Sequence, residues 1–265
     1  MSTANRGRID LRLEDRSAGR IATLTISNPA RLNAIGSEMM SEFVAHAGAL
    51  AADETLRAVV VTGAGERAFA GGIDIREMTR IEAPDVARRF IRQVHACCAA
   101  VRAIRAPVIA KVRGHCYGGA LELIASCDLR IAASDARFGM PEVRLGIPSV
   151  VEAAILPMLI GWGRTRRLLY TGETILAEQA LAWGLVEEVA RPEELDAAVD
   201  ACLAAILACG PAAVRQQKAL MQAWERLPLA DAITAGIDAF ADAYRGAEPK
   251  AMMDAFLAAR AAGKS

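Results

Sequence analysis

The N-terminal part of the chain combines a hairpin pattern with a helical one. Apolar side chains alternate or cluster in Ile9 to Arg16 and in Ile21 to Ile26, on either side of Ser17-Ala18-Gly19. This pattern predicts a two-stranded hairpin. From Ser37 to Ala52 the apolar residues recur at helical spacing, so we expect an amphipathic helix with Ser37 as its N-cap.

Strand-like and helical segments continue to alternate further along the chain. Short apolar runs, typical of buried strands, are separated by glycine-rich loops and helical stretches. Repetition of such units predicts a mainly parallel sheet with its ligand site in the loops beyond the strand ends. The predicted strands are Ala58 to Thr62, the run that begins at Pro107, Asp128 to Ala132 and Leu185 to Val189, and the predicted helices are Asp85 to Arg105, Ala120 to Cys127, Val151 to Ile160 and Arg164 to Tyr170.

The pattern changes beyond Pro192. Four successive segments, 193–209, 211–225, 229–245 and 248–262, are helical in period and rich in alanine. We therefore place a domain boundary near residue 195, between a core of residues 1–195 and a helical region of residues 196–265. A helical region that cannot bury all its apolar faces alone is expected to pack on the core or on another subunit, which predicts an oligomer.

Composition narrows the range of partners. The chain of 265 residues carries 31 Lys and Arg against 31 Asp and Glu, so there is no net basic field to attract nucleic acid or an anionic membrane. No apolar run approaches the roughly 20 residues that span a bilayer. The first residues mix Arg with Asp and Glu, unlike a secretory or organellar leader. We expect a cytoplasmic protein with a small-molecule partner.

The cysteine and histidine residues give no disulfide or metal-binding pattern. The six cysteines form no CxxC pair and lie in apolar segments, which indicates buried reduced thiols. His46, His95 and His115 are scattered, with no carboxylate at ligand spacing. We therefore expect no metal site.

Glu122 stands in surroundings that are unusual for a carboxylate. It lies in the first turn of the helix expected after Gly118-Gly119, and the residues at 121, 123 and 124 are Leu or Ile. The residues three or four positions away are small, so the helix leaves room for a ligand against the Glu122 face. The alternative is a solvent-facing acid that the helix dipole stabilises.

Glu142 is the second candidate acid. It follows the sharp turn Phe138-Gly139-Met140-Pro141 and precedes Val143. A loop acid is usually solvated, so Glu142 alone indicates little. Together, Glu122 and Glu142 indicate acid–base chemistry, because two neighbouring carboxylates in a dry site titrate as a coupled pair, one charged and one protonated.

Two glycine loops are suited to bind an oxygen atom. Gly71-Gly72-Ile73-Asp74 and Gly118-Gly119-Ala120 each follow a strand-like run and can each present a bare backbone N–H group. Two N–H groups that converge on one oxygen form an oxyanion hole. Removal of one such donor typically costs on the order of 100- to 1,000-fold in rate.

A third glycine loop leaves a different class of enzyme open. Gly63-Ala64-Gly65-Glu66-Arg67-Ala68 fits the GxGxx(G/A) dinucleotide fingerprint after a strand. That fingerprint must open directly into a helix, whereas here Gly71-Gly72 intervene and the helix begins near Asp85. An NAD(P)-dependent oxidoreductase is therefore the alternative, and bound cofactor in the purified protein would be its evidence.

Five motifs in order give the chain a resemblance to the crotonase superfamily, and within it to the enoyl-CoA hydratases, over nearly the full length. The resemblance implies an α/β fold, a crotonase-like spiral of repeated ββα units, followed by a C-terminal helical region through which family members form trimers or dimers of trimers. The motifs are NPARLNAI (Asn28 to Ile35), AFAGGIDIREM (Ala68 to Met78), PVIAKVRGHCYGGALELIASCDLRIA (Pro107 to Ala132), FGMPEVRLGI (Phe138 to Ile147) and TGETILAEQALAWGLV (Thr171 to Val186).

The resemblance also implies roles for residues within these motifs. The backbone N–H groups of Ile73 and Gly119 would hold the thioester carbonyl oxygen, and the two family acids fall on Glu122 and Glu142. No cofactor is implied, because coenzyme A is part of the acyl-CoA substrate. The residues that match the family's coenzyme A and substrate positions are Ala30, Arg31, Leu32, Gly71, Gly72, Asp74 and Gly118.

The presence of both acids resembles the hydratases, which add water reversibly and with syn geometry across the 2,3 double bond of a 2-enoyl-CoA. Such an addition needs a base for the water at C3 and an acid for C2, while negative charge collects on the carbonyl oxygen. As a hypothesis, Glu122 deprotonates the water and Glu142 delivers the C2 proton.

Other functions of the same framework stay open. It also serves double-bond isomerases, dehydratases and thioester hydrolases that act on acyl-CoA. Some superfamily members bind RNA, which is the non-enzymatic alternative. Zero net charge and the absence of a Lys-rich helix argue against RNA binding.

The chain departs from the family pattern after Pro148. It reads SVVEAAILPMLIGWGR, with Val150 and Val151 in place of flexible glycines beside the acyl pocket and Glu152 as a third acid. One interpretation of Glu152 is a surface residue at the start of a helix. The other is a residue that reshapes the pocket or joins the chemistry. Ile73 is bulkier than the small residue usual at its position, which predicts a narrower pocket.

Overall fold

A six-stranded sheet is the largest element of the structure, a computed structural model that describes residues 7–262. Its strand order is β1-β2-β3-β5-β7-β10. β1 and β2 form the antiparallel hairpin that the apolar pattern predicts, and the remaining neighbours run parallel. The strands are β1 (Arg8–Arg16), β2 (Gly19–Ser27), β3 (Leu56–Gly63), β5 (Val108–Val112), β7 (Leu129–Ala133) and β10 (Glu188–Ala190).

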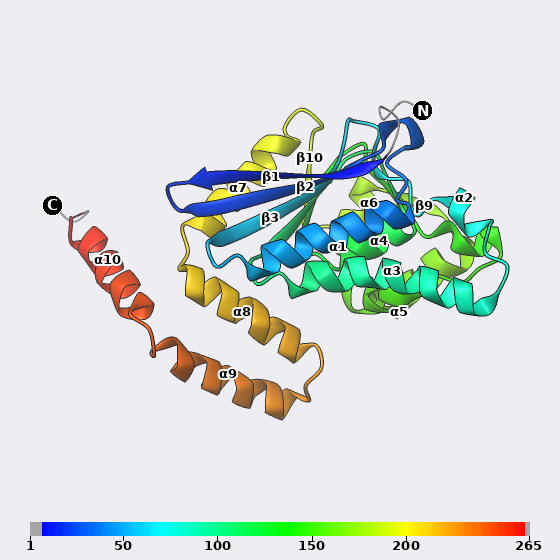
Figure 1. Ribbon diagram of the computed structural model, residues 1–265. Helices are drawn as coiled ribbons and strands as arrows, with labels where there is room; N and C mark the ends of the chain where they lie inside the picture. The colour runs from blue at the N-terminus through cyan, green and yellow to red at the C-terminus, as the bar shows by residue number, and fades with distance from the viewer. Residues whose placement is uncertain (1–6, 263–265) are drawn as a thin grey trace.

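Both faces of this sheet are buried, which explains why its central strands are continuous apolar runs. One face packs against α1 (Ser37–Ala52) and α3 (Pro84–Ala103), which lie side by side across it (Figure 1). The other face packs against α7 (Leu195–Leu207). In β3, Val59 belongs to the first packed layer and Val60 to the second.

A second sheet of four strands is built from segments of three residues each. Its order is β4-β6-β8-β9, in which β4, β6 and β8 run parallel and β9 is antiparallel to β8. Each of β4, β6 and β8 follows a strand of the large sheet and precedes a helix, so the predicted α/β spiral of ββα units is confirmed. The strands are β4 (Ala68–Ala70), β6 (His115–Tyr117), β8 (Arg137–Gly139) and β9 (Thr174–Leu176).

The helices that follow the small sheet differ in part from the prediction. Residues 151–155 form a 3-10 turn instead of an α-helix. The next helix then runs from Leu156 to Thr171 through a break at Gly161. The elements are α2 (Ile75–Met78), α4 (Gly119–Ala125), the 3-10 helices η2 (Pro29–Arg31), η3 (Pro141–Leu145) and η4 (Val151–Ile155), α5 (Leu156–Thr171) and α6 (Ala177–Trp183).

The sequence pattern misses one sheet and misplaces one helix cap. It does not predict the four strands of the small sheet, because three residues are too few to show a period. The prediction of Ser37 as an N-cap is wrong, since Gly36 occupies that position. Ser37 instead donates from its backbone N–H and its Oγ to the carboxylate of Glu77, at 3.0 and 2.5 Å.

The C-terminal segments form helices as the alanine-rich pattern predicts. After α7 come α8 (Pro211–Trp224), α9 (Leu229–Ala243) and α10 (Glu248–Ala262). Buried Lys218 anchors α8, because its Nζ donates to Asp128 at 2.7 Å and to the carbonyl of Ala106 at 3.0 Å. α9 packs on α8, and α9 and α10 stand away from the sheets (Figure 1).

No single helix among residues 7–262 has the length and apolar character to cross a membrane. Among these residues, only α7 and α8 taken together have that length and composition, and the chain bends by 104° between them. The prediction of buried cysteines is confirmed at four of six positions: Cys97, Cys98, Cys116 and Cys127 are buried, Cys202 is half-buried and Cys209 is exposed.

Candidate active site

The loops that carry the candidate residues follow the three parallel strands of the small sheet. β4 leads into Gly71 to Ile73, β6 leads through Gly118 into α4, and β8 leads into η3. Parallel strands place their carboxyl ends at one edge of a sheet, so these three loops meet there. The N–H of Gly118 donates to the carbonyl of Gly139 at 2.9 Å, which holds the second and third loops together.

A cavity of about 610 Å³ lies at this edge. Its volume is in the range of small-molecule sites, which are mostly apolar with a few polar groups. Apolar side chains from α2, α3 and residues 145–150 form most of the lining. The predicted site residues that line this cavity are Gly71, Gly72, Ile73, Gly118, Gly119, Glu122 and Glu142.

Two cavity residues have free backbone N–H groups. Within residues 7–262, neither the N–H of Ile73 nor that of Gly119 has a hydrogen-bond acceptor. The two residues are also in contact, since a Cβ added at Gly119 would lie 2.8 Å from Cγ1 of Ile73. Glycine at 119 therefore lets the two loops approach each other. Neighbouring free N–H groups are suited to bind an oxygen atom that carries negative charge.

Glu122 is a buried acid at the start of α4. It lies in the first turn, as predicted, and only 3 % of its surface is exposed. Burial raises the pKa of Glu122 to about 8, and the charges of Glu142 and Glu152 add to the rise. The nearby backbone N–H groups of Ala153 and Val150 lower the pKa of Glu122 and so act in the opposite direction. The carboxyl group is thus protonated at neutral pH, and the solvent-facing alternative is wrong.

Glu142 is half-buried in the first turn of η3. Burial raises its pKa, while hydrogen bonds from its own N–H and from Ser149 Oγ, 2.9 Å from Oε2, lower it. Its Oε1 lies where a side chain at position 118 would collide with it. Gly118 also has a φ of 57°, so the backbone conformation favours glycine here, and glycine lets Glu142 keep this position. The sequence gives no signal that Ser149 is a hydrogen-bond donor to Glu142.

The two carboxyl groups influence each other's ionisation. The charge of Glu142 raises the pKa of Glu122, so the pair releases its protons in two steps. Between these steps one group is a carboxylate and the other a carboxylic acid. Such a pair can accept a proton from one atom and donate a proton to another, as the addition or elimination of water and the shift of a double bond require.

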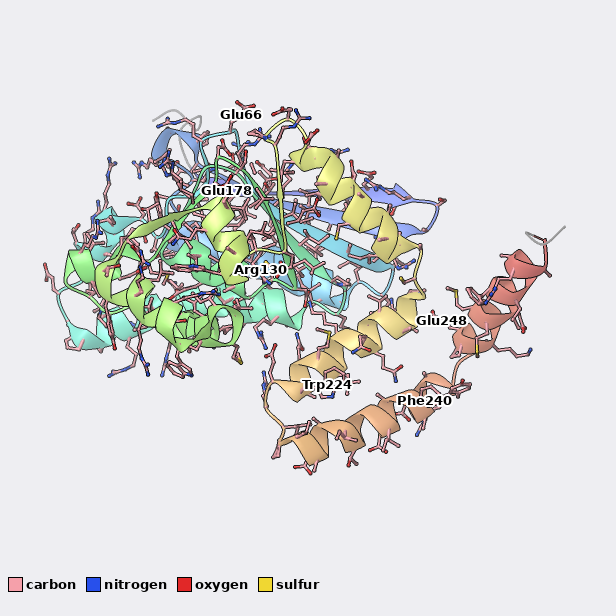
Figure 2. The ribbon with its side chains drawn as sticks, turned by 180° about the vertical axis from the view of Figure 1, so that it is seen from behind. Glu66, Arg130, Glu178, Trp224, Phe240 and Glu248 are labelled. Carbon is pink, nitrogen blue, oxygen red and sulfur yellow. The ribbon has the colours of Figure 1, made fainter. Side chains whose placement is uncertain are left out.

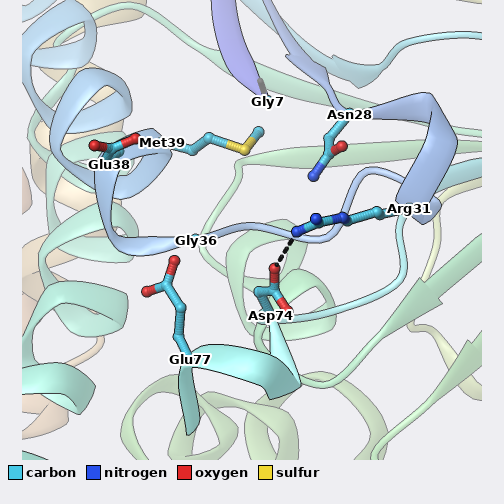
Figure 3. Close-up of a pocket in the computed structure, with 8 residues that line it drawn as sticks. All are labelled: Gly7, Asn28, Arg31, Gly36, Glu38, Met39, Asp74 and Glu77. Carbon is cyan, nitrogen blue, oxygen red and sulfur yellow. Dashed lines mark hydrogen bonds and ion pairs between the residues drawn. The ribbon is translucent and has the colours of Figure 1, made fainter. Parts of the chain in front are cut away.

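A smaller pocket of about 280 Å³ lies beside the loop after β2 (Figure 3). Arg31 and Asp74 both line it, and Nη1 of Arg31 is 3.1 Å from Oδ2 of Asp74. The N–H of Gly71 donates to the carbonyl of Leu32 at 2.7 Å, which ties the same two loops together. The structure therefore brings most predicted coenzyme A residues close to one another. Exposed Ala30 and half-buried Leu32 line neither pocket.

Asn33 holds this loop and has no predicted role. It is 1 % exposed and has a left-handed φ of 57°, which Asn tolerates better than most residues. Its side chain accepts from the N–H of Asn28 at 2.9 Å and donates to the carbonyls of Ala64 and Ala68 at 2.9 and 2.8 Å. The only sequence signal is its place in NPARLNAI.

The segment after Pro148 forms part of the cavity wall. Val150 lines the cavity, as expected, whereas half-buried Val151 does not. Glu152 lies in the first turn of a helix, η4, but is only 8 % exposed. The interpretation of Glu152 as a surface acid is therefore wrong.

The glycine loop after β3 lacks the geometry of a dinucleotide site. β3 ends at Gly63 and the loop leads into strand β4, so no helix begins where a pyrophosphate would bind. Glu66 of this loop is exposed (Figure 2) and lies 3.3 Å from Arg113. In the part of the chain that the structure describes, no group of three or more His, Cys, Asp or Glu side chains is arranged to hold a metal ion.

Comparisons with known proteins show the family of this chain. The model of the enoyl-CoA hydratase/isomerase family matches residues 16–263. The chain is 35% identical over 243 residues to the short-chain-enoyl-CoA hydratase of Clostridium acetobutylicum, covering 91% of this chain and 93% of that protein. It is 36% identical over 244 residues to the crotonyl-CoA hydratase of Syntrophomonas wolfei, covering 92% and 94%.

A solved structure has the same fold. The crystal structure of an enoyl-CoA hydratase from Mycobacterium smegmatis matches with a TM-score of 0.89 at 30% identity, and the match covers 93% of this chain and 95% of that chain.

Replacement of Glu122 by Gln is expected to stabilise the protein at pH 8 but not at pH 4. At low pH the carboxyl group is protonated in both states. As the pH rises, the unfolded chain releases the proton first, while the folded protein keeps it until about pH 8, so the wild type loses stability over this interval. Urea unfolding at one protein concentration should show Glu122→Gln more stable by ~1–3 kcal/mol at pH 8.

The matched control for this measurement is Glu178→Gln, which removes an exposed carboxylate (Figure 2). It should change the free energy of unfolding little at either pH. An effect of Glu122→Gln that is the same at pH 4 and pH 8 would contradict the raised pKa.

Proposed function

The chain belongs to the enoyl-CoA hydratase/isomerase family, and we propose that it is a lyase that adds water across the 2,3 double bond of a 2-enoyl-CoA thioester. The observation that carries this proposal is the pair of acids, Glu122 and Glu142, in one cavity with the free N–H groups of Ile73 and Gly119. The relatives named as short-chain-enoyl-CoA and crotonyl-CoA hydratases support a short enoyl-CoA as substrate.

The two N–H groups bind the thioester carbonyl oxygen in this proposal. When water adds at C3, the electrons of the double bond move toward the carbonyl and negative charge collects on its oxygen. Donors that are already in place stabilise this charge without reorganisation, which is the largest contribution in many acyl-transfer enzymes. Neither donor needs a side chain of a particular type, so the bulky Ile73 is compatible with the role.

The acid pair supplies the two proton transfers. One carboxylate takes a proton from the water whose oxygen bonds to C3, and one carboxylic acid gives a proton to C2, so the product is a 3-hydroxyacyl-CoA and the net change is one water. Burial raises the pKa of both Glu122 and Glu142. Because the protons of a coupled pair belong to the pair, we assign the two transfers to the pair as a unit, and the role of Glu122 as the base stays a hypothesis.

Substrate binding follows from the two adjacent pockets. The apolar lining of the large cavity suits the acyl chain, and Val150 narrows it. Arg31 and Asp74 are placed in this proposal at the coenzyme A, which is part of the substrate, and no separate cofactor takes part. A cytoplasmic location stays a prediction from the sequence.

We further propose that the protein is a homotrimer or a dimer of trimers. α9 carries a stripe of exposed apolar side chains at helical spacing, and α10 carries a second group. Such surfaces on helices that stand away from the sheets are expected to be covered by another subunit. The exposed side chains are Leu229, Ile233, Ile237 and Phe240 on α9, Tyr244 at the C-cap of α9, and Met252, Met253, Phe256 and Leu257 on α10.

Glu122→Gln and Glu142→Gln should each lower kcat for crotonyl-CoA hydration by about 100-fold or more, because each removes one proton transfer. Loss of the enoyl-thioester absorbance with product analysis over a panel of acyl-CoA thioesters measures this, and it separates hydration from isomerisation and hydrolysis. Glu178→Gln is the control and should keep the wild-type rate. Activity within tenfold of wild type in either variant would overturn the assignment of the acids.

Sedimentation velocity at micromolar concentration should show a trimer or a hexamer. Phe240→Asp places a charge in the apolar stripe and is expected to dissociate the assembly, since an unpaired charge is costly in an apolar contact. Asp238→Asn on the same helix lies outside the stripe and should leave the assembly intact. A wild-type monomer would contradict this part of the proposal.

A further inference from the structure

Glu152 is a buried carboxylate outside the cavity. It lies on η4, which packs against both α3 and α4. Only 9 % of its side chain is exposed, and glutamate is rarely so buried without a specific partner. Because Glu152 does not line the cavity, contact with substrate does not explain its burial.

The partner of Glu152 is His95 on α3. Nδ1 of His95 is 2.6 Å from Oε1 of Glu152, which is hydrogen-bond distance. Within the described residues the other oxygen, Oε2, is buried without a hydrogen-bond partner. The imidazole itself is 57 % exposed. This hydrogen bond therefore ties η4 to α3 and leaves one carboxylate oxygen unsatisfied.

The turn that Glu152 ties down also packs against α4, the helix that carries Glu122. The backbone N–H groups of Val150 and Ala153, on either side of Glu152 in the sequence, are close enough to Glu122 to lower its pKa. Between them Val151 has a φ of 40°, a region that β-branched residues avoid. Backbone strain of this kind persists only where the surrounding structure holds it, and it clusters at active sites.

We propose that the His95–Glu152 contact is a positioning device for Glu122: by anchoring η4 to α3, it holds the strained turn that packs against α4, the helix that carries Glu122. This inference rests on the proposed hydratase function, in which Glu122 takes part in proton transfer. His95 and Glu152 act through Glu122 and are positioning residues.

The charge of Glu152 adds a second effect on Glu122. It raises the pKa of Glu122, in the same direction as the charge of Glu142. The Cys98 thiol has a pKa well above its ordinary value because it is buried, so it stays uncharged. Loss of the Glu152 charge therefore lowers the pKa of Glu122. The titratable and charged groups around Glu122 are Arg88, His95 and Cys98 on α3, Tyr117 on β6, Glu142 on η3 and Glu152 on η4.

Glu152→Gln in the full chain tests this inference, because the amide keeps the size of the side chain and removes its charge. With crotonyl-CoA as substrate, kcat should fall about tenfold or more while KM stays within about threefold. The alkaline limb of the kcat/KM profile, which reports the second step of the acid pair, should move to lower pH by roughly half a unit or more. Glu178→Gln should leave both unchanged.

A variant of the exposed partner separates positioning from misfolding. His95→Gln replaces the exposed partner in the contact with Glu152. Because paired residues act non-additively, the variant with both substitutions should be about as active as the less active of the two single variants. Additive losses, or a wild-type rate and pH profile in Glu152→Gln, would overturn the inference alone. A wild type that hydrates no enoyl-CoA would overturn the inference together with the proposed function.

Discussion

Parallel pairing of β4, β6 and β8 is the constraint on which the candidate active site depends. Each strand has three residues, yet each continues from a long strand of the large sheet, so the packed core sets their positions. The shared edge brings Ile73, Gly119 with Glu122, and Glu142 together from segments far apart in the sequence. Glycines at 118 and 119 then permit the close approach, because side chains there would strike Glu142 and Ile73.

The site combines this geometry with a costly burial. Glu122 sits on a helix whose residues are all buried, and its carboxyl group keeps a proton at neutral pH because water is excluded and Glu142 and Glu152 add negative charge. The two N–H groups of the η4 turn offset part of that cost. Stability is given up here for a group that can exchange protons near neutral pH, a trade-off common at active sites.

The long elements and the acids could be predicted from the sequence, whereas the frame that joins them could not. Periodicity gives α1, α3, the hairpin and the C-terminal helices, and the motifs single out Glu122 and Glu142. The strands of the small sheet are too short to show a period, so the sequence pattern does not reveal this sheet. The pattern alone places the site at the edge of the large sheet, whereas the structure places it at the edge of the small sheet. The burial of Glu152 also escapes sequence reasoning, because its partner His95 is 57 residues away and on another element.

A crystal structure with bound 3-hydroxybutyryl-CoA tests the central claim most directly, namely that one cavity presents two oxyanion donors and two acids to the same acyl group. We expect the thioester oxygen at about 3 Å from the N–H nitrogens of both Ile73 and Gly119, and the 3-hydroxyl within hydrogen-bond distance of Glu122 or Glu142. An acyl group bound outside this cavity, or a thioester oxygen away from both donors, would contradict it.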